Sequence, residues 1–284
     1  MARIRENIYL IENVTAGQRC LVSPSVGRTW LDFHVKLTNI TLAQATNIRV
    51  LLVSPQRTIT LQEFQDGNEL KNLNDRYGRK TNSTTLSFYF RKPEMETEGQ
   101  SMATALGTGG LQSVRVEFDI DGAVVSPGVK AWGRKTANRL VTAGILPYIT
   151  NHNLGGQAQG DNHFDNIEKR DRIACLHVLN TDVSSLKLKV DDAIAFDLIR
   201  ADAEFDETIG GRVPYASNYG MVIDFTTAGV LDEALVMQGK DYQTQQMRLT
   251  STLGASLSTT TRLLVEYLST WASLAGGNTQ RAAA

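Results

Sequence analysis

The chain has 284 residues, of which 42% are hydrophobic and 21% are charged, a composition typical of a globular protein with a sizeable core. Lys and Arg number 29 against 30 Asp and Glu, so the net charge of -1 gives no electrostatic basis for specific nucleic-acid binding by the whole chain. No apolar run is long enough for a signal peptide or a membrane span, so we expect synthesis in the cytosol without insertion into a bilayer.

Short apolar segments rich in Val, Ile, Leu, Phe, Tyr and Thr dominate the chain, and turn-forming residues bound each of them. They predict strands at 8–11, 30–37, 48–53, 84–90, 114–120, 173–179, 186–190, 221–225, 247–253 and 262–268. Helical spacing of apolar residues is clearest at 60–74 and 228–238. Many short strands with few helices predict an all-β sandwich or barrel.

An internal duplication sets the domain organisation. "HVKLTNITLAQATNIRVLL", "TITLQEF" and "TTLSFYF" in the first half are similar in order and character to "CLHVLNTDVSSLKLKV", "IAFDLI" and "GMVIDF" in the second. Phe64 to Phe90 and Ile199 to Phe225 both span 26 residues. The strands at 114–120 and 263–269 complete the match by pairing Glu117 with Glu266. We predict two tandem all-β domains, 1–132 and 133–284.

Three stretches lack apolar periodicity. Residues 126–139 contain Pro, Gly and several basic residues, and we interpret them as the junction between the domains. Residues 151–166 are rich in Gly and Asn and are expected to form a long polar surface loop. The tail 275–284 is expected to be frayed.

The glycine cluster in "ALGTGGLQSVRVEFDIDGA" (105–123) does not have the order of a phosphate-binding loop. Such loops follow a strand and open a helix, whereas these glycines precede a predicted strand. "DIDG" lacks the later carboxylates of a calcium loop, so it predicts a strand end and a turn. No catalytic set is present among the motifs, and we predict that the protein is not an enzyme.

Metal-binding signals are weak. The run Asp202, Glu204, Asp206 and Glu207 is a candidate cation site, although such runs usually form a solvated face. The four histidines do not form the closely spaced pair of a metal-binding β-barrel. Cys20 and Cys175 lie far apart in apolar segments and are predicted to be buried, reduced thiols.

A family resemblance is carried by fragments that recur in the same order over residues 8 to 271. They are "IENVTAGQRCLVSPSVGRTW", "TNIRVLL", "LSFYFRKPEM", "ALGTGGLQSVRVEFDIDGA", "RIACLHV" and "MRLTSTLGASLSTTTRLLVEYLSTW". With this ordered set the chain resembles the major capsid proteins of corticoviruses, the icosahedral, membrane-containing phages of marine bacteria.

The resemblance implies a double jelly roll, two eight-stranded antiparallel barrels side by side. It also implies homotrimers with a pseudo-hexagonal outline that tile an icosahedral shell over an internal lipid membrane, with penton or vertex proteins as further partners. It places the protein in the virion after assembly in the host bacterial cytoplasm. No cofactor is implied, and a structural calcium or other ion is expected without assigned ligands. Candidate membrane-facing residues are Arg3, Arg5, Lys130, Arg134, Lys135 and Arg139.

Two other functions are compatible with an all-β chain. A carbohydrate-binding protein or hydrolase would need a concave site with converging carboxylates or aromatic side chains. A minor vertex or receptor-binding virion protein would share the composition but occur in few copies per particle.

Overall fold

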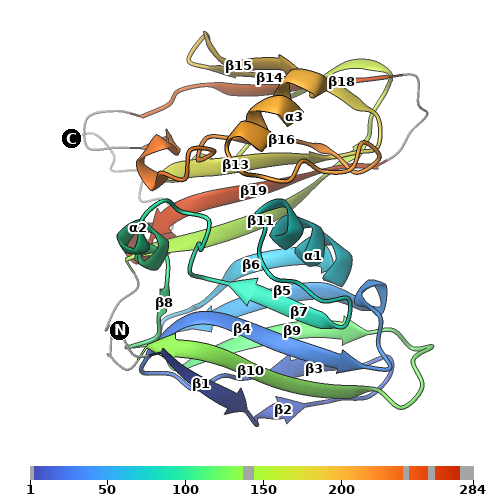
Figure 1. Cartoon of the computed structure of the whole chain (residues 1–284), viewed down its shortest axis with the longest axis vertical. Coiled ribbons are helices and arrows are strands. Elements are labelled where there is room, and N and C mark those ends of the chain that lie inside the picture. The colour runs from blue at the N-terminus through green and yellow to red at the C-terminus, as the bar shows by residue number, and fades with distance from the viewer. Residues whose placement is uncertain (1–2, 137–143, 239–242, 255–259, 276–284) are drawn as a thin grey trace.

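A computed structural model describes residues 3–136, 144–238, 243–254 and 260–275 of the chain. They form two β-barrels, one stacked above the other in Figure 1, with the chain passing from the N-terminal barrel to the C-terminal barrel once. Within these residues, every helix is too short or too polar to cross a lipid bilayer.

The N-terminal barrel consists of two antiparallel sheets. Its elements are β1 (Arg3–Ile8), β2 (Ile11–Glu12), β3 (Arg19–Val22), β4 (Thr29–Thr38), β5 (Ala45–Val53), β6 (Thr58–Asp66), α1 (Gly67–Arg76), β7 (Thr85–Tyr89), α2 (Glu98–Ala103), β8 (Leu106–Gly107), β9 (Ser113–Ile120) and β10 (Gly128–Thr136). One sheet has the strand order β1-β10-β4-β7, and the facing sheet has the order β3-β9-β5-β6.

The C-terminal barrel repeats this arrangement. Its elements are β11 (Ile145–Gly156), β12 (Gly160–Phe164), β13 (Arg172–Leu179), β14 (Val183–Val190), β15 (Ala193–Ile199), α3 (Arg200–Ile209), β16 (Met221–Asp224), β17 (Leu235–Val236), β18 (Met247–Leu253), β19 (Thr260–Thr270) and α4 (Trp271–Ala275). Its sheets have the orders β11-β19-β13-β16 and β12-β18-β14-β15.

The two strand orders correspond one to one along the chain. β1, β4, β7 and β10 correspond to β11, β13, β16 and β19, while β3, β5, β6 and β9 correspond to β12, β14, β15 and β18. In both barrels a ten-residue helix follows the fifth of these strands along the chain, α1 after β6 and α3 after β15. Each barrel therefore has eight principal strands in the same order, which confirms the predicted double jelly roll and the tandem duplication.

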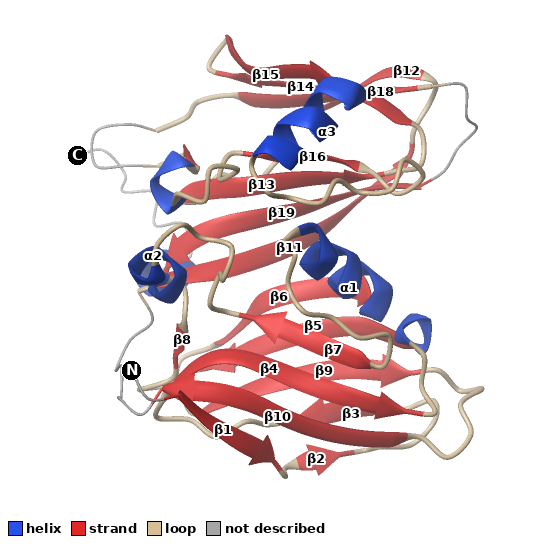
Figure 2. Ribbon diagram, viewed as in Figure 1, coloured by secondary structure: helices blue, strands red, loops and turns tan. Residues whose placement is uncertain are grey.

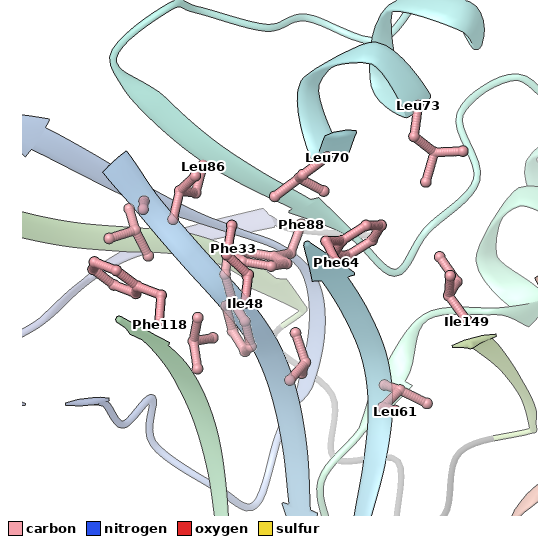
Figure 3. Packing of buried hydrophobic residues seen from close by; sticks show 14 of the residues in the cluster. Phe33, Ile48, Leu61, Phe64, Leu70, Leu73, Leu86, Phe88, Phe118 and Ile149 are labelled. Carbon is pink, nitrogen blue, oxygen red and sulfur yellow. The ribbon is translucent and has the colours of Figure 1, made fainter. Parts of the chain in front are cut away.

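Alternating burial explains how the strands build the barrels. Along β9 the buried residues Val114, Val116, Phe118 and Ile120 alternate with more exposed ones, as expected for a sheet with one face on a core. Figure 3 shows Phe118 among the side chains that fill the N-terminal barrel, with α1 adding leucines above them. Closing strands into two facing sheets hides most of their hydrogen-bonding edges.

The predicted helices required correction. Residues 60–74 divide between β6 and α1, because Asp66 caps the helix: its side chain accepts a hydrogen bond from the Glu69 amide at 2.9 Å. Residues 228–238 form only a 3-10 turn at Leu231–Glu233 and the short β17. The six-residue helix α2 and the ten-residue helix α3 were not predicted from the sequence.

The predicted irregular stretches also differ from the structure. Most of 151–166 is strand: β11 pairs with β19, and β12 pairs with β18 through polar cross-strand neighbours such as His163 and Thr250. Most of 126–139 is β10, so a boundary after residue 132 falls inside a strand. In the predicted tail, Ala275 ends α4, and 276–284 lie outside the described residues.

The match between the segments 114–120 and 263–269 is wrong in structural terms. By sheet position β9 corresponds to β18, whereas β19 corresponds to β10. Glu117 is therefore not the counterpart of Glu266. β10 was missed because its polar residues and glycines obscure the apolar alternation that marks a strand.

Candidate functional site

The most unusual site in the described residues is a buried polar cluster between the two barrels. The outer face of the sheet β11-β19-β13-β16 packs against α1 and the edge of β6, and β6 pairs with β11 in parallel through Ile149 and Gln62. Figure 2 shows α1 lying between the barrels at this contact. We call the polar groups there the inter-barrel cluster. It comprises Arg76, Tyr77, Lys92, Cys175, His177, Arg212, Tyr215, Asp224 and Glu266.

The end of α1 places the N-terminal contribution to this cluster. Arg76 is the last residue of the helix and Tyr77 is its C-cap, so both side chains leave the helix toward the C-terminal barrel. Gly78 follows with a φ of 63°, a backbone conformation that ends the helix at little cost only for glycine. The local signal for helix termination thus positions an arginine and a tyrosine in the interface.

Asp224 at the end of β16 is one centre of charge in the cluster. Arg76 donates to its Oδ2 at 2.9 Å, Arg212 donates to the same oxygen at 3.2 Å, and the Thr226 amide donates to Oδ1 at 2.8 Å. Burial opposes ionisation, but the two guanidinium groups outweigh it and hold the pKa of Asp224 well below its ordinary value. The carboxylate is therefore ionised and ties the two barrels together.

Glu266 on β19 is the second centre. Tyr77 donates to Oε1 at 2.6 Å, His177 lies 2.9 Å from the same oxygen, and Lys92 donates to Oε2 at 3.1 Å. Burial opposes the charge, but Lys92 and the hydrogen bond from His177 hold the pKa of Glu266 well below its ordinary value.

Burial lowers the pKa of His177, which keeps the ring neutral at pH 7. A neutral ring can donate from Nε2 to Glu266 and accept at Nδ1 from the Tyr215 hydroxyl, which is 3.1 Å away. This chain of hydrogen bonds satisfies buried groups from β13, β19, the loop that contains Tyr215 and the α1 terminus.

Cys175, His177 and Glu266 form the one group of potential metal ligands among the described residues, with their ligand atoms within 4.8 Å of one another. The donor set does not fit a metal well. A metal needs the thiolate, yet burial raises the pKa of Cys175 well above its ordinary value. Lys92 already neutralises Glu266, and the Tyr77 hydroxyl lies 3.2 Å from the Cys175 sulfur. The arrangement is that of a structural hydrogen-bond network.

The acidic residues predicted as a cation site lie on α3 but do not converge. Asp202 and Asp206 are exposed, whereas Glu204 pairs with Arg200 at 3.3 Å. Glu207 is buried on the opposite side of the helix, 3.6 Å from Arg76. The four acidic side chains have different surroundings because a helix distributes neighbouring residues around its axis.

Glu207 leads to a testable pH dependence. Burial raises the pKa of its carboxyl to about 7, and Arg76 only partly offsets the effect. Ionised Glu207 therefore costs stability above pH 7, and this cost is relieved as the pH falls toward 4.5. We expect Glu207→Gln to raise the free energy of unfolding by roughly 2 kcal/mol at pH 8.

The advantage of Glu207→Gln should shrink on acidification to pH 5, measured by urea unfolding at both pH values. Asp206→Asn is the matched control because Asp206 is an exposed acid on the same helix. An equal gain for Glu207→Gln at pH 8 and pH 5 would contradict the assignment.

The candidate membrane-facing residues lie on two adjacent strands. Arg3 and Arg5 are on β1 and Lys130, Arg134 and Lys135 on β10, with Arg5 opposite Arg134 in register. Several have partners: Arg3 pairs with Glu98 at 3.1 Å, Arg134 with Asp32 at 2.5 Å, and Lys135 with Glu6. Arg139 lies outside the described residues.

The inter-barrel cluster was not predicted from the sequence. One signal was present, since Glu266 interrupts the apolar run "RLLVEYL" and Lys92 follows the apolar "LSFYF". A charged residue inside such a run indicates a buried partner. The partners lie up to 189 positions away in the chain, so their identity could not be read from the pattern.

Comparisons with known proteins agree with this architecture. The family model of the viral coat protein P2 N-terminal domain matches residues 5–137, and that of the P2 C-terminal domain matches residues 146–271. The chain is 26% identical over 276 residues to the major capsid protein P2 of Pseudoalteromonas phage PM2, covering 93% of this chain and 96% of that protein.

Solved structures give the same result. The crystal structure of the major capsid protein P2 from bacteriophage PM2 matches with a TM-score of 0.85 and 25% identity, over 95% of this chain and 98% of that one. The MCP of STIV, the Sulfolobus Turreted Icosahedral Virus, matches with a TM-score of 0.67 and 10% identity, over 98% and 100%. At 10% identity, the match to the STIV protein shows a shared fold alone.

Proposed function

The chain belongs to the viral coat protein P2 family, and on that premise we propose that it is a major capsid protein whose homotrimers tile an icosahedral shell. The observation that carries the proposal is the pair of barrels with the same strand order, joined side by side in one chain. Two similar barrels per chain give a trimer six barrels, which approximates six-fold symmetry in a lattice.

The inter-barrel cluster supports a structural role. A capsomer keeps its outline only if the two barrels of each chain hold a fixed relative orientation. Buried ion pairs such as Arg76 with Asp224 and Lys92 with Glu266 have strict geometric requirements, so they favour one arrangement of the barrels. We infer that this rigidity, and not catalysis, is the reason for the buried charges.

The wider setting of the shell follows from the same family. We propose that the trimers enclose an internal lipid membrane, meet penton or vertex proteins at the five-fold positions, and assemble in the cytoplasm of a bacterial host. A net charge of -1 supports dense packing because it limits repulsion between copies. We propose no enzymatic activity and no obligatory cofactor.

The test is the solution mass and the abundance of the protein in particles. Sedimentation equilibrium of the purified chain should give a species three times the 31.2 kDa chain mass. In purified virions this chain should be the most abundant protein. A strict monomer would contradict the capsomer, and presence in only a few copies per particle would favour a vertex or receptor-binding protein. Specific sugar binding by the isolated chain would favour the carbohydrate-binding alternative.

A further inference from the structure

The segment 207–215 runs from the last turn of α3 into the loop before β16 and crosses the inter-barrel cluster. On the C-terminal barrel, Arg212 donates to Asp224 at 3.2 Å. On the N-terminal barrel, the Val213 amide donates to the Arg76 carbonyl oxygen at 2.8 Å. Because this segment is tied to both barrels, we call residues 207–215 the strap.

The strap covers buried groups, but its outer side is exposed. The Tyr215 hydroxyl lies 3.1 Å from Nδ1 of His177, and both side chains are buried. On the outer side, Ile209 and Val213 are 70% and 53% exposed. A segment with few buried apolar side chains and an exposed outer surface is of the kind that opens by local unfolding while the rest of the fold stays intact.

Glu207 is a poorly satisfied buried group at the start of the strap. Its Oε2 atom lies 3.6 Å from Nε of Arg76, which is longer than a hydrogen bond. Within the described residues, neither of these two atoms has a hydrogen-bond partner. A neutral carboxyl group tolerates such surroundings at modest cost, whereas a charged oxygen without donors is expensive to bury. Ionised Glu207 therefore gains free energy if the strap opens and the carboxylate reaches water.

The charged groups around Glu207 come from α1, from β16 and from α3 with its strap. Arg76 and Arg212 favour the ionised carboxylate, while Asp224 and Glu204 oppose it. Burial has the largest effect and raises the pKa of Glu207 to about 7 from its ordinary value of 4.5. In an open strap the carboxyl group regains its ordinary pKa, so opening is coupled to the release of a proton.

We propose that the strap is a proton-controlled tie between the two barrels, which is closed over the inter-barrel cluster when Glu207 is neutral and opens locally when Glu207 is ionised. In the closed form Arg76 and Arg212 are both held on Asp224, and the two barrels keep one relative orientation. In the open form the contacts of Arg212 and Val213 are lost, and water reaches the cluster. The tie is built within a single chain, so it goes beyond the proposed trimer and does not depend on it.

Proton linkage gives the direction and size of the effect. Below pH 4.5 the Glu207 carboxyl is neutral in both forms, and above pH 7 it is ionised in both, so the opening equilibrium depends on pH between these values. A rise in pH favours the open form, because the open form binds the proton more weakly. From pH 5 to pH 7 the equilibrium constant for opening should increase on the order of 40-fold.

Hydrogen exchange of the full chain, followed by mass spectrometry, measures the opening of the strap. The amides of residues 210–213 all donate hydrogen bonds in the closed form, so their exchange reports opening. Protection factors, which are corrected for the intrinsic pH dependence of exchange, are compared at pH 5 and pH 7. The protection of these amides should fall on the order of 40-fold over this range, while that of the buried strand β9 should stay unchanged.

Two variants identify the group that controls opening. Glu207→Gln should leave the strap equally protected at pH 5 and pH 7, because the amide side chain cannot ionise. Asp206→Asn removes an exposed acid of the same helix and should retain the pH dependence of the wild type.

Three results would overturn the proposal. The first is wild-type protection of the strap that does not change with pH, and the second is a pH dependence that survives in Glu207→Gln. The third is an equal loss of protection in β9, which would indicate global unfolding instead of local opening. The proposed capsid function would stand in each case, since the solution mass tests it separately.

Discussion

Replacing Glu266 by Gln should lower the free energy of unfolding by about 3–5 kcal/mol, the usual cost of leaving a buried charge without its partner. Lys92 is 2% exposed and donates to Glu266 at 3.1 Å, so the substitution leaves its ammonium group buried with only the more distant Glu94 carboxylate, at 4.0 Å, as a counterion. The hydrogen bonds from Tyr77 and His177 also lose their charged acceptor. Urea unfolding followed by tryptophan fluorescence measures the loss.

Two further variants test whether the loss of stability in Glu266→Gln comes from the buried charge. Glu117→Gln is the control, since Glu117 occupies a similar sequence context on β9 but is only half-buried at the surface, and it should change stability by less than about 0.5 kcal/mol. The double variant Lys92→Met/Glu266→Leu should recover much of the loss because it removes both charges together. If Glu266→Gln were as mild as Glu117→Gln, the inter-barrel cluster would not hold the barrels together.

Phe33→Ala should cost about 3–5 kcal/mol through the cavity left in the N-terminal barrel. The Phe33 ring is fully buried and packs edge-on against Trp30 at 4.6 Å and Phe90 at 5.0 Å between ring centroids. The neighbouring strand β10 is packed closely against Phe33, because a Cβ on Gly133 would lie 2.9 Å from the Phe33 ring. The neighbours cannot collapse to fill the space, so the full cost of the cavity is expected.

The control for Phe33→Ala is Tyr9→Ala, which removes an aromatic ring that is 85% exposed and should change the unfolding midpoint little. Phe33→Leu keeps most of the volume and should lose less than Phe33→Ala. Thermal unfolding by calorimetry distinguishes the three variants. Equal midpoints for Phe33→Ala and Tyr9→Ala would show that the packing around Phe33 does not limit stability.

The strands were the structural feature that could be predicted best from the sequence. The alternation along 114–120 and the apolar run at 173–179 predict β9 and β13 because a strand on a core buries every second residue or nearly all of them. The equal spacing from Phe64 to Phe90 and from Ile199 to Phe225 identified two strands joined by a polar stretch in each half, but it did not show that the second stretch contains α3. The resemblance to corticovirus capsid proteins, carried by ordered fragments, is confirmed by the family match.

The contacts of the candidate site could be predicted from the sequence to a much smaller extent. The acids of α3 were visible as a run, but the sequence could not show that Glu207 turns inward to Arg76 while Asp206 faces solvent. The basic residues of β10 suggested an irregular junction because their alternation with Trp132 and Ala131 is weak. The function of a charged side chain depends on what lies across the sheet from it, and that partner is set by register.

The sequence alone determined that this protein is an all-β chain with two related halves, because local alternation and spacing are properties of neighbouring residues. Only the tertiary structure decided that β19 corresponds to β10, that α1 packs between the two barrels, and that α3 buries only Ala203 and Glu207. These facts depend on contacts between residues more than a hundred positions apart, such as Tyr77 with Glu266. Periodicity carries no information about such contacts, since they arise only when two barrels pack against each other.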